Sequence, residues 1–137
     1  MYIRLTGDSN VESGVGSIVL ELSEPLKEAF SQKDYGDGLL GLVIVLMCRD
    51  KELGFERRVK FARKEKKIYM DILLDIDELR PASPELRKIK IADSLLRGIP
   101  EVVRQFEIDK FNLDGLLGDL RDWLGNRGIQ STLGAKI

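Results

Sequence analysis

Apolar and polar side chains alternate without a break along one segment near the middle of the chain. Apolar side chains take every second position there, at Ile68, Met70, Ile72, Leu74 and Ile76. The positions between them hold Tyr69, Asp71, Leu73 and Asp75. Because successive side chains of a strand point to opposite faces, this period predicts a strand with one packed face. The other face is expected to meet solvent or a partner.

Three other segments are also predicted to be strands. A short alternating stretch covers residues 2–6, an apolar run covers 39–48, and a second alternating stretch covers 55–63. The apolar run is far shorter than the roughly 20 residues that a membrane-spanning helix needs. A turn at 49–54 connects the segment 39–48 to the segment 55–63. A turn at 64–66 then connects 55–63 to the strand at 68–76. We therefore expect a three-stranded antiparallel meander beside the N-terminal strand.

Helical spacing of apolar residues appears in three segments, residues 17–30, 84–106 and 112–124. Ser83 followed by Pro84 is a typical start of a helix, since serine caps the first turn and proline fits its first position. Pro25 is expected to kink or divide the first helix, and Gly98 with Pro100 to divide the second.

The resulting order is β-α-β-β-β-α-α, without a βαβ alternation. It predicts an α+β fold in which helices pack on one face of an antiparallel sheet. The length of 137 residues suits one domain. We place that domain at residues 1–124 and expect a partly ordered C-terminal tail at 125–137, where glycines are frequent and periodicity is weak.

Composition excludes most catalytic chemistry. The chain has no histidine, so it has no Ser-His-Asp triad and no histidine-ligated metal. Its single cysteine, Cys48, excludes an internal disulfide and a multi-cysteine metal site. We therefore expect no enzymatic activity, no cofactor and no metal. A lone free cysteine and the absence of a secretory signal pattern favour a cytoplasmic protein without a membrane anchor.

Charge is unevenly distributed along the chain, although Lys+Arg number 22 and Asp+Glu 23. Residues 49–67 hold nine basic and four acidic side chains. This basic hairpin is open to three interpretations: a solvated edge, a site for an acidic protein, or a site for nucleic acid. The overall net charge of -1 and the placement of Phe55 and Phe61 on the core face argue against nucleic acid. An RNA-binding or ribosome-associated module nevertheless stays the alternative function.

Acidic residues follow the hairpin. Asp75, Asp77 and Glu78 could form a magnesium site only if the strand continued past Ile76, so we do not expect one. An acidic surface that meets a basic partner, or a merely solvated face, explains them better. Tyr35 and Tyr69 are the best candidates for exposed aromatic residues, which are favoured at binding hot spots. The candidate partner-binding residues are Tyr35, Tyr69, Asp71, Asp75, Asp77 and Glu78.

Several segments, taken in order, resemble small immunity proteins of bacterial polymorphic-toxin systems, including those of contact-dependent growth inhibition. They are the first strand ending in Gly7, the turn Tyr35-Gly36-Asp37-Gly38, the strand ending in Cys48, Phe55-Glu56-Arg57-Arg58, Lys66-Lys67-Ile68 leading to Asp71–Asp75, and the helix after Pro84. The resemblance covers residues 1–124 and contains no single diagnostic motif.

The resemblance implies a non-enzymatic cytoplasmic inhibitor that binds one cognate toxin domain, commonly a nuclease, and blocks its active site or substrate surface. It supplies no catalytic residues and does not locate the interface, which varies within such families. We expect the interface on the outer sheet face and at the acidic strand exit. Reversing Asp75 and Asp77 to lysine is then predicted to weaken toxin binding. Self-association is left open.

Overall fold

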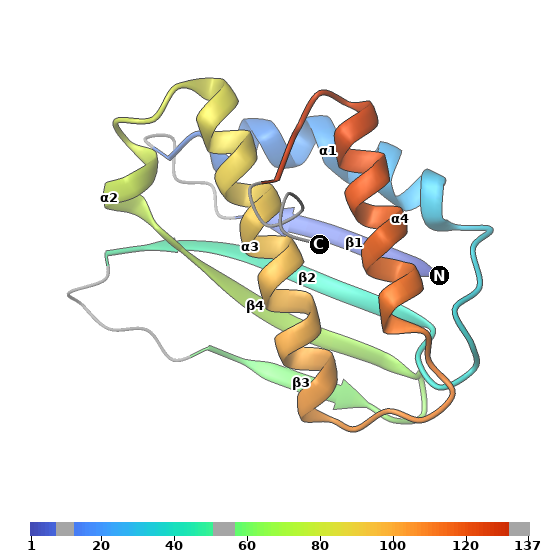
Figure 1. The fold of residues 1–137 in the computed structure, drawn as a ribbon. Helices are drawn as coiled ribbons and strands as arrows, with labels where there is room; N and C mark the ends of the chain where they lie inside the picture. The colour runs from blue at the N-terminus through green and yellow to red at the C-terminus, as the bar shows by residue number, and fades with distance from the viewer. Residues whose placement is uncertain (8–12, 51–56, 132–137) are drawn as a thin grey trace.

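The computed structural model describes residues 1–7, 13–50 and 57–131 of the chain (Figure 1). Its strands and helices are β1 Tyr2–Gly7, α1 Val15–Phe30, β2 Gly41–Arg49, β3 Val59–Ala62, β4 Lys67–Asp75, α2 Ile76–Leu79, α3 Pro84–Gln105 and α4 Leu113–Asn126. The α+β class is confirmed, with the strands joined in one four-stranded sheet.

The sheet is mixed, and the predicted antiparallel meander is wrong. The strand order is β1-β2-β4-β3, so β4 lies between β2 and β3. β2 pairs in parallel with β4 along both full strands, from Gly41 beside Lys67 to Arg49 beside Asp75. Only β3 and β4 form the expected antiparallel hairpin. The two nine-residue strands bury more surface side by side at the centre, while the four-residue β3 suits an edge.

A βαβ unit, which the sequence analysis did not expect, opens the fold. β1 and β2 are parallel neighbours joined through α1. Parallel strands cannot be joined by a tight hairpin, so the chain crosses over the sheet between them. The apolar face of α1 packs on β1, where a Cβ added to Gly7 would lie 2.8 Å from Val19 Cγ2. Gly7 thus permits the close approach of helix and strand.

The expected helix breaks do not occur. α1 continues through Pro25, and Leu22, Leu26 and Phe30 around it are all buried. α3 likewise runs as one helix through Gly98 and Pro100. An interior proline removes one backbone hydrogen bond, which the packing of the flanking turns outweighs. Gly98 is a packing position rather than a break, since its Cβ would lie 3.0 Å from Ile72 Cδ1 of β4.

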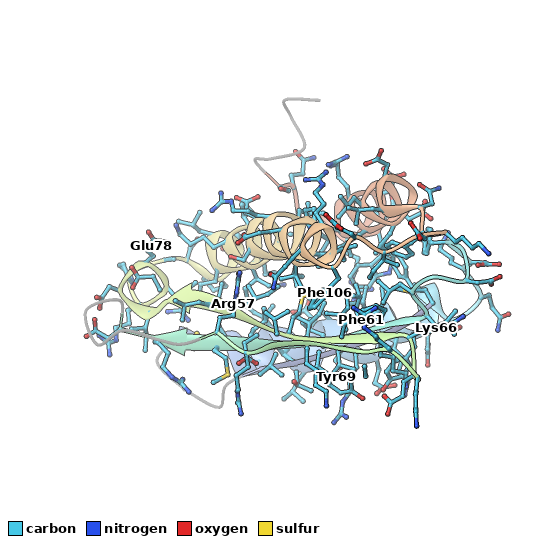
Figure 2. The ribbon with its side chains drawn as sticks, turned by 90° about the horizontal axis from the view of Figure 1, so that it is seen from below. Arg57, Phe61, Lys66, Tyr69, Glu78 and Phe106 are labelled. Atoms are coloured by element: carbon cyan, nitrogen blue, oxygen red, sulfur yellow. The ribbon has the colours of Figure 1, made fainter. Side chains whose placement is uncertain are left out.

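All helices that contact the sheet lie on the same side of it, as expected. Figure 1 shows α3 and α4 crossing in front of the strands, and Figure 2 shows them above the sheet with Phe106 on the helix side. One continuous apolar core fills the space between them, and it includes Ile68, Met70, Ile72 and Leu74 of β4. The packed face predicted from alternation in this strand is therefore confirmed.

The remaining predicted segments fall partly outside the described residues. Those outside include most of the turn at 49–54, residues 55 and 56 of the second alternating stretch, and residues 132–137 of the tail. In the described part of the tail, Ile129 is buried and the Ser131 hydroxyl lies 2.5 Å from Asp93 Oδ1. The C-terminal residues up to 131 thus pack against α3.

Candidate functional site

The side of the sheet opposite the helices, here called the outer face, is not covered by any helix among the described residues. Its side chains are Tyr2, Arg4 and Thr6 of β1, Val43, Val45 and Met47 of β2, Lys60 of β3, and Lys67, Tyr69, Asp71 and Leu73 of β4. These side chains share one face because side chains alternate along a strand, and their neighbours along the strands point into the core.

Tyr69 stands at the centre of the outer face and points away from the helices (Figure 2). Tyr69 is 39% exposed, and Leu73 on the same strand is 41% exposed. The Tyr69 hydroxyl donates a 2.8 Å hydrogen bond to Glu65 Oε2, which raises the pKa of this tyrosine. Half-buried Val43 and Val45 lie beside it and line a hollow of about 490 Å³. The centre of the outer face is therefore apolar with one polar hydroxyl.

Asp71 shares the outer face but is not available to a partner. It is 6% exposed, and its Oδ2 accepts hydrogen bonds from the backbone N–H of Arg58 at 3.2 Å and from Arg58 Nε at 3.3 Å. Asp71 thus fastens the start of the β3 edge to β4. Its position on the strand was predictable from alternation, but its partner was not.

The acidic strand exit has a structural explanation for each carboxylate. Asp75 Oδ1 caps α2 by accepting from the backbone N–H of Asp77 at 3.0 Å. Asp77 pairs with Arg80 at 3.4 Å, and Glu78 of α2 lies 3.9 Å from Lys90 of α3. The strand ends at Asp75. Within residues 1–7, 13–50 and 57–131, no three metal-ligating side chains come together.

Tyr35 is buried, against the expectation of exposure. It is 7% exposed and packs edge-on against Phe111, with ring centroids 6.5 Å apart. Its hydroxyl donates to Asp119 Oδ2 at 2.5 Å. Burial, reinforced by this bond, raises the pKa of Tyr35 well above its ordinary value. The structure therefore places Tyr35 in the core. Its partners there, Phe111 and Asp119, are distant from it in the sequence.

The basic hairpin divides its charges between the two sides of the sheet. Arg57 pairs with Glu101 of α3 at 3.1 Å, on the helix side. Arg58 and Lys60 are exposed, and Lys60 belongs to the outer face. Lys67 reaches across β2 and places its Nζ 4.7 Å from the centre of the Tyr2 ring. Gly41 lets it pass, because a Cβ there would lie 2.9 Å from Lys67 Cγ.

A second hollow, of about 550 Å³, lies at the end of the sheet beside Phe61 and Phe106 (Figure 2). Lys66, Glu107 and Lys110 border it, each with a positive φ, of 54°, 50° and 56°. Acidic and basic side chains alternate around this hollow, so its charge favours no class of ligand. Its backbone is held by the segment at residues 35–38, where Gly38 N–H donates to Lys110 O at 3.1 Å.

Arg4, Val43 and Val45 were not predicted to be parts of a site. These residues join Tyr69 only through the β1-β2-β4 pairing, which the expected meander did not contain. The half-polar pattern of residues 2–6 was the one local signal that β1 exposes a face. No helix in the described ranges combines the length and apolar character required to cross a membrane.

Comparison with models of protein families matches residues 1–126 to immunity protein 44. No curated protein and no solved structure matches the chain. The matched range holds every strand and helix described above and ends where α4 ends. The resemblance to immunity proteins is thereby confirmed. The chain belongs to the immunity protein 44 family, and it is an immunity protein of a toxin system.

Proposed function

We propose that the protein neutralises one cognate toxin domain by laying the outer face of its sheet over the toxin's active site or substrate surface. The observation that carries the proposal is the exposure of Tyr69 and Leu73 on the one face that no described helix covers. Tyrosine is enriched at binding hot spots because it joins a large apolar ring to a hydroxyl.

The outer face suits an extended contact in size. Nine-residue strands are about 30 Å long and three strand spacings add about 14 Å of width. Such a face provides the centre of a standard interface, which buries roughly 800 Å² on each partner.

We infer that the toxin is a nuclease. The immunity proteins that this chain resembles commonly act on nucleases. A nuclease must admit a long polymer, so its substrate surface is an open groove rather than a deep pocket, and a flat sheet can cover it. The inhibitor acts by occupancy alone, in the cytoplasm, as a one-to-one complex. Cys48, the single cysteine of the chain, is buried and forms no disulfide, which is consistent with a reducing compartment.

The test uses the cognate toxin domain, identified by pull-down with this protein from its native host, in a catalytically inactive form. Tyr69→Ala is expected to weaken binding by about 30-fold, the effect of losing roughly 2 kcal/mol at a hot spot. Leu86→Ala is the matched control, since Leu86 is 43% exposed but lies on α3. Isothermal titration calorimetry measures both. Unchanged affinity for Tyr69→Ala together with weakened binding for Leu86→Ala would move the interface to the helices.

Stoichiometry separates inhibition by occupancy from catalysis. Added to the active toxin, the protein is expected to lower nuclease activity in proportion and to abolish it at one equivalent. Complete loss of toxin activity at a small fraction of an equivalent would contradict the non-enzymatic mechanism.

One observation favours the alternative, an RNA-binding module. The exposed Tyr69 shares the outer face with Lys60, so a basic residue and an exposed aromatic ring do lie together. Sheets that bind single-stranded RNA stack bases on such rings. Fluorescence anisotropy with mixed-sequence single-stranded RNA at low salt tests this function, which predicts binding that weakens steeply as salt is raised.

A further inference from the structure

We infer that the toxin surface covered by the outer face is rich in carboxylates. This inference rests on the proposed function and names the chemistry of the partner at the same surface. It departs from the expectation of an acidic interface that the sequence suggested.

Two exposed cations flank the centre of the outer face. The strand register places Arg4, Val43, Tyr69 and Lys60 side by side across the four strands. Arg4 and Lys60 are exposed, and neither forms a salt bridge within residues 1–7, 13–50 and 57–131. Three strand spacings separate their backbones by about 14 Å.

The other charges of this face do not cancel these cations. Lys67 lies over the Tyr2 ring, and the Arg58 side chain is 84% exposed although its Nε meets Asp71. Among the described residues of this face, the carboxylates near them are Glu65, which accepts from the Tyr69 hydroxyl, and the nearly buried Asp71. Asp75 at the end of β4 lies beside Arg49 of β2, so this pair adds no net charge. The outer face therefore carries an excess of positive charge.

The acidic strand exit, by contrast, has cations of the same chain beside it. Asp77 and Glu78 lie against Arg80 and Lys90, and Asp75 caps a helix. A basic partner would have to compete with these internal cations. Charge complementarity therefore favours an acidic partner at the outer face over a basic partner at the exit.

The centre between the cations selects protein rather than nucleic acid. Val43, Val45 and Leu73 are aliphatic. Of the two described rings on this face, that of Tyr69 is exposed, whereas the half-buried ring of Tyr2 is covered by Lys67. Aliphatic side chains pack against the apolar core of a protein interface, whereas bases need aromatic surfaces for stacking. The overall charge of -1 also opposes a polyanion.

These features describe the complementary toxin patch: an apolar centre with carboxylates on two sides. In a nuclease, carboxylates gather where divalent metal ions are held. The inference thus places the contact on or beside the metal-binding part of the active site rather than on a basic phosphate-binding surface.

The experiment reverses the flanking cations with the double variant Arg4→Glu, Lys60→Glu. Its matched control is Arg104→Glu, Arg127→Glu, which changes the net charge equally at exposed residues in and after the helices. Association with the inactive cognate toxin domain is measured by surface plasmon resonance at about 50 and about 200 mM salt, a range over which screening changes strongly. Circular dichroism verifies that each variant is folded.

The outer-face reversal is expected to slow association by about 10-fold or more, because like charges now approach each other. Wild-type association should slow as salt is raised, and that of the reversed variant should quicken. The helix control should stay within about twofold of the wild type. A third variant, Asp77→Lys, should bind no more weakly than the wild type, and a marked loss would restore the acidic exit as the interface.

Failure of the inference is distinguishable from failure of the proposed function. If Tyr69→Ala weakens toxin binding but the outer-face reversal does not, the face is correct and the carboxylate-rich partner is refuted. If neither change weakens binding, the outer face is not the interface and both are refuted. Tight binding of the wild type to single-stranded RNA that is lost on Arg4→Glu, Lys60→Glu would also overturn the inference, since the face would then be a nucleic-acid site.

Discussion

Replacing Gly38 with alanine is expected to destabilise the fold strongly, although Gly38 lies in a turn near the surface. Residues 35–38 run against the connection between α3 and α4. Gly38 N–H donates to Lys110 O at 3.1 Å, and Asn112 N–H donates to Tyr35 O at 2.7 Å. A Cβ at Gly38 would lie 1.7 Å from Asp109 O, a backbone atom that cannot swing aside. This turn is one of the segments that carried the resemblance to immunity proteins.

The loss in the free energy of unfolding can be worked out from the movement that an added Cβ at Gly38 requires. Real Cβ atoms essentially never approach another heavy atom more closely than 3.0 Å, so the two segments must separate by more than 1 Å. Separation breaks the hydrogen bond from Gly38 to Lys110, worth about 1 kcal/mol net. Overpacking of a tight site costs a further 1–3 kcal/mol or so. The expected loss in the free energy of unfolding is therefore roughly 2–4 kcal/mol.

Urea unfolding followed by circular dichroism measures this loss. Gly118→Ala in α4 is the matched control, since an added Cβ there meets nothing within 4 Å. Alanine favours a helix interior over glycine, so this control should gain about 0.5–1 kcal/mol. A Gly38→Ala protein within about 0.5 kcal/mol of the wild type would refute the reasoning, because a surface substitution without a clash changes stability by no more than that.

Three other substitutions test single contacts. Tyr35→Phe should lose about 1 kcal/mol at neutral pH with its hydrogen bond to Asp119. Because burial and that bond raise the pKa of Tyr35, its contribution is fully present below pH about 10 and is lost as pH rises further. Urea curves measured across alkaline pH should therefore show a decline in wild-type stability that is smaller in Tyr35→Phe. Asp71→Ala should lose about 1–3 kcal/mol in a urea titration, since the Arg58 N–H is left without its acceptor. Ser83→Ala should lose about 1 kcal/mol in thermal unfolding, because its hydroxyl caps α3 by accepting a backbone hydrogen bond.

The separate elements of this fold were predictable because their signals are local. The two-residue period of β4 required only that one face be buried, and the structure buries it. The start of α3 followed from Ser83 and Pro84, which satisfy the first turn without help from the rest of the chain. The helix breaks were predicted wrongly because Pro25 and Gly98 were judged by local preference alone. Tertiary packing of the surrounding turns outweighs that preference.

Strand order needed the tertiary structure. Consecutive strands often pair, which favoured a meander. The chain instead places its two longest strands together and leaves the short, charged β3 at the edge. Which strands pair depends on the total surface buried by the whole sheet. The pattern of residues within one strand does not reveal that total.

The composition of the sequence by itself determined that histidine- and multi-cysteine-based chemistry is absent. Its local periods predicted α1, α3, α4, the strands and the exposed position of Tyr69, but not the short α2, where a strand had been predicted to continue through Ile76. Only the tertiary structure decided the electrostatics of the outer face. It places Lys90 within 3.9 Å of Glu78, and it brings Arg4 and Lys60 into one row across the sheet. Coulomb energy depends on distance in space and on burial, and proximity along the chain determines neither for residues on different strands and helices.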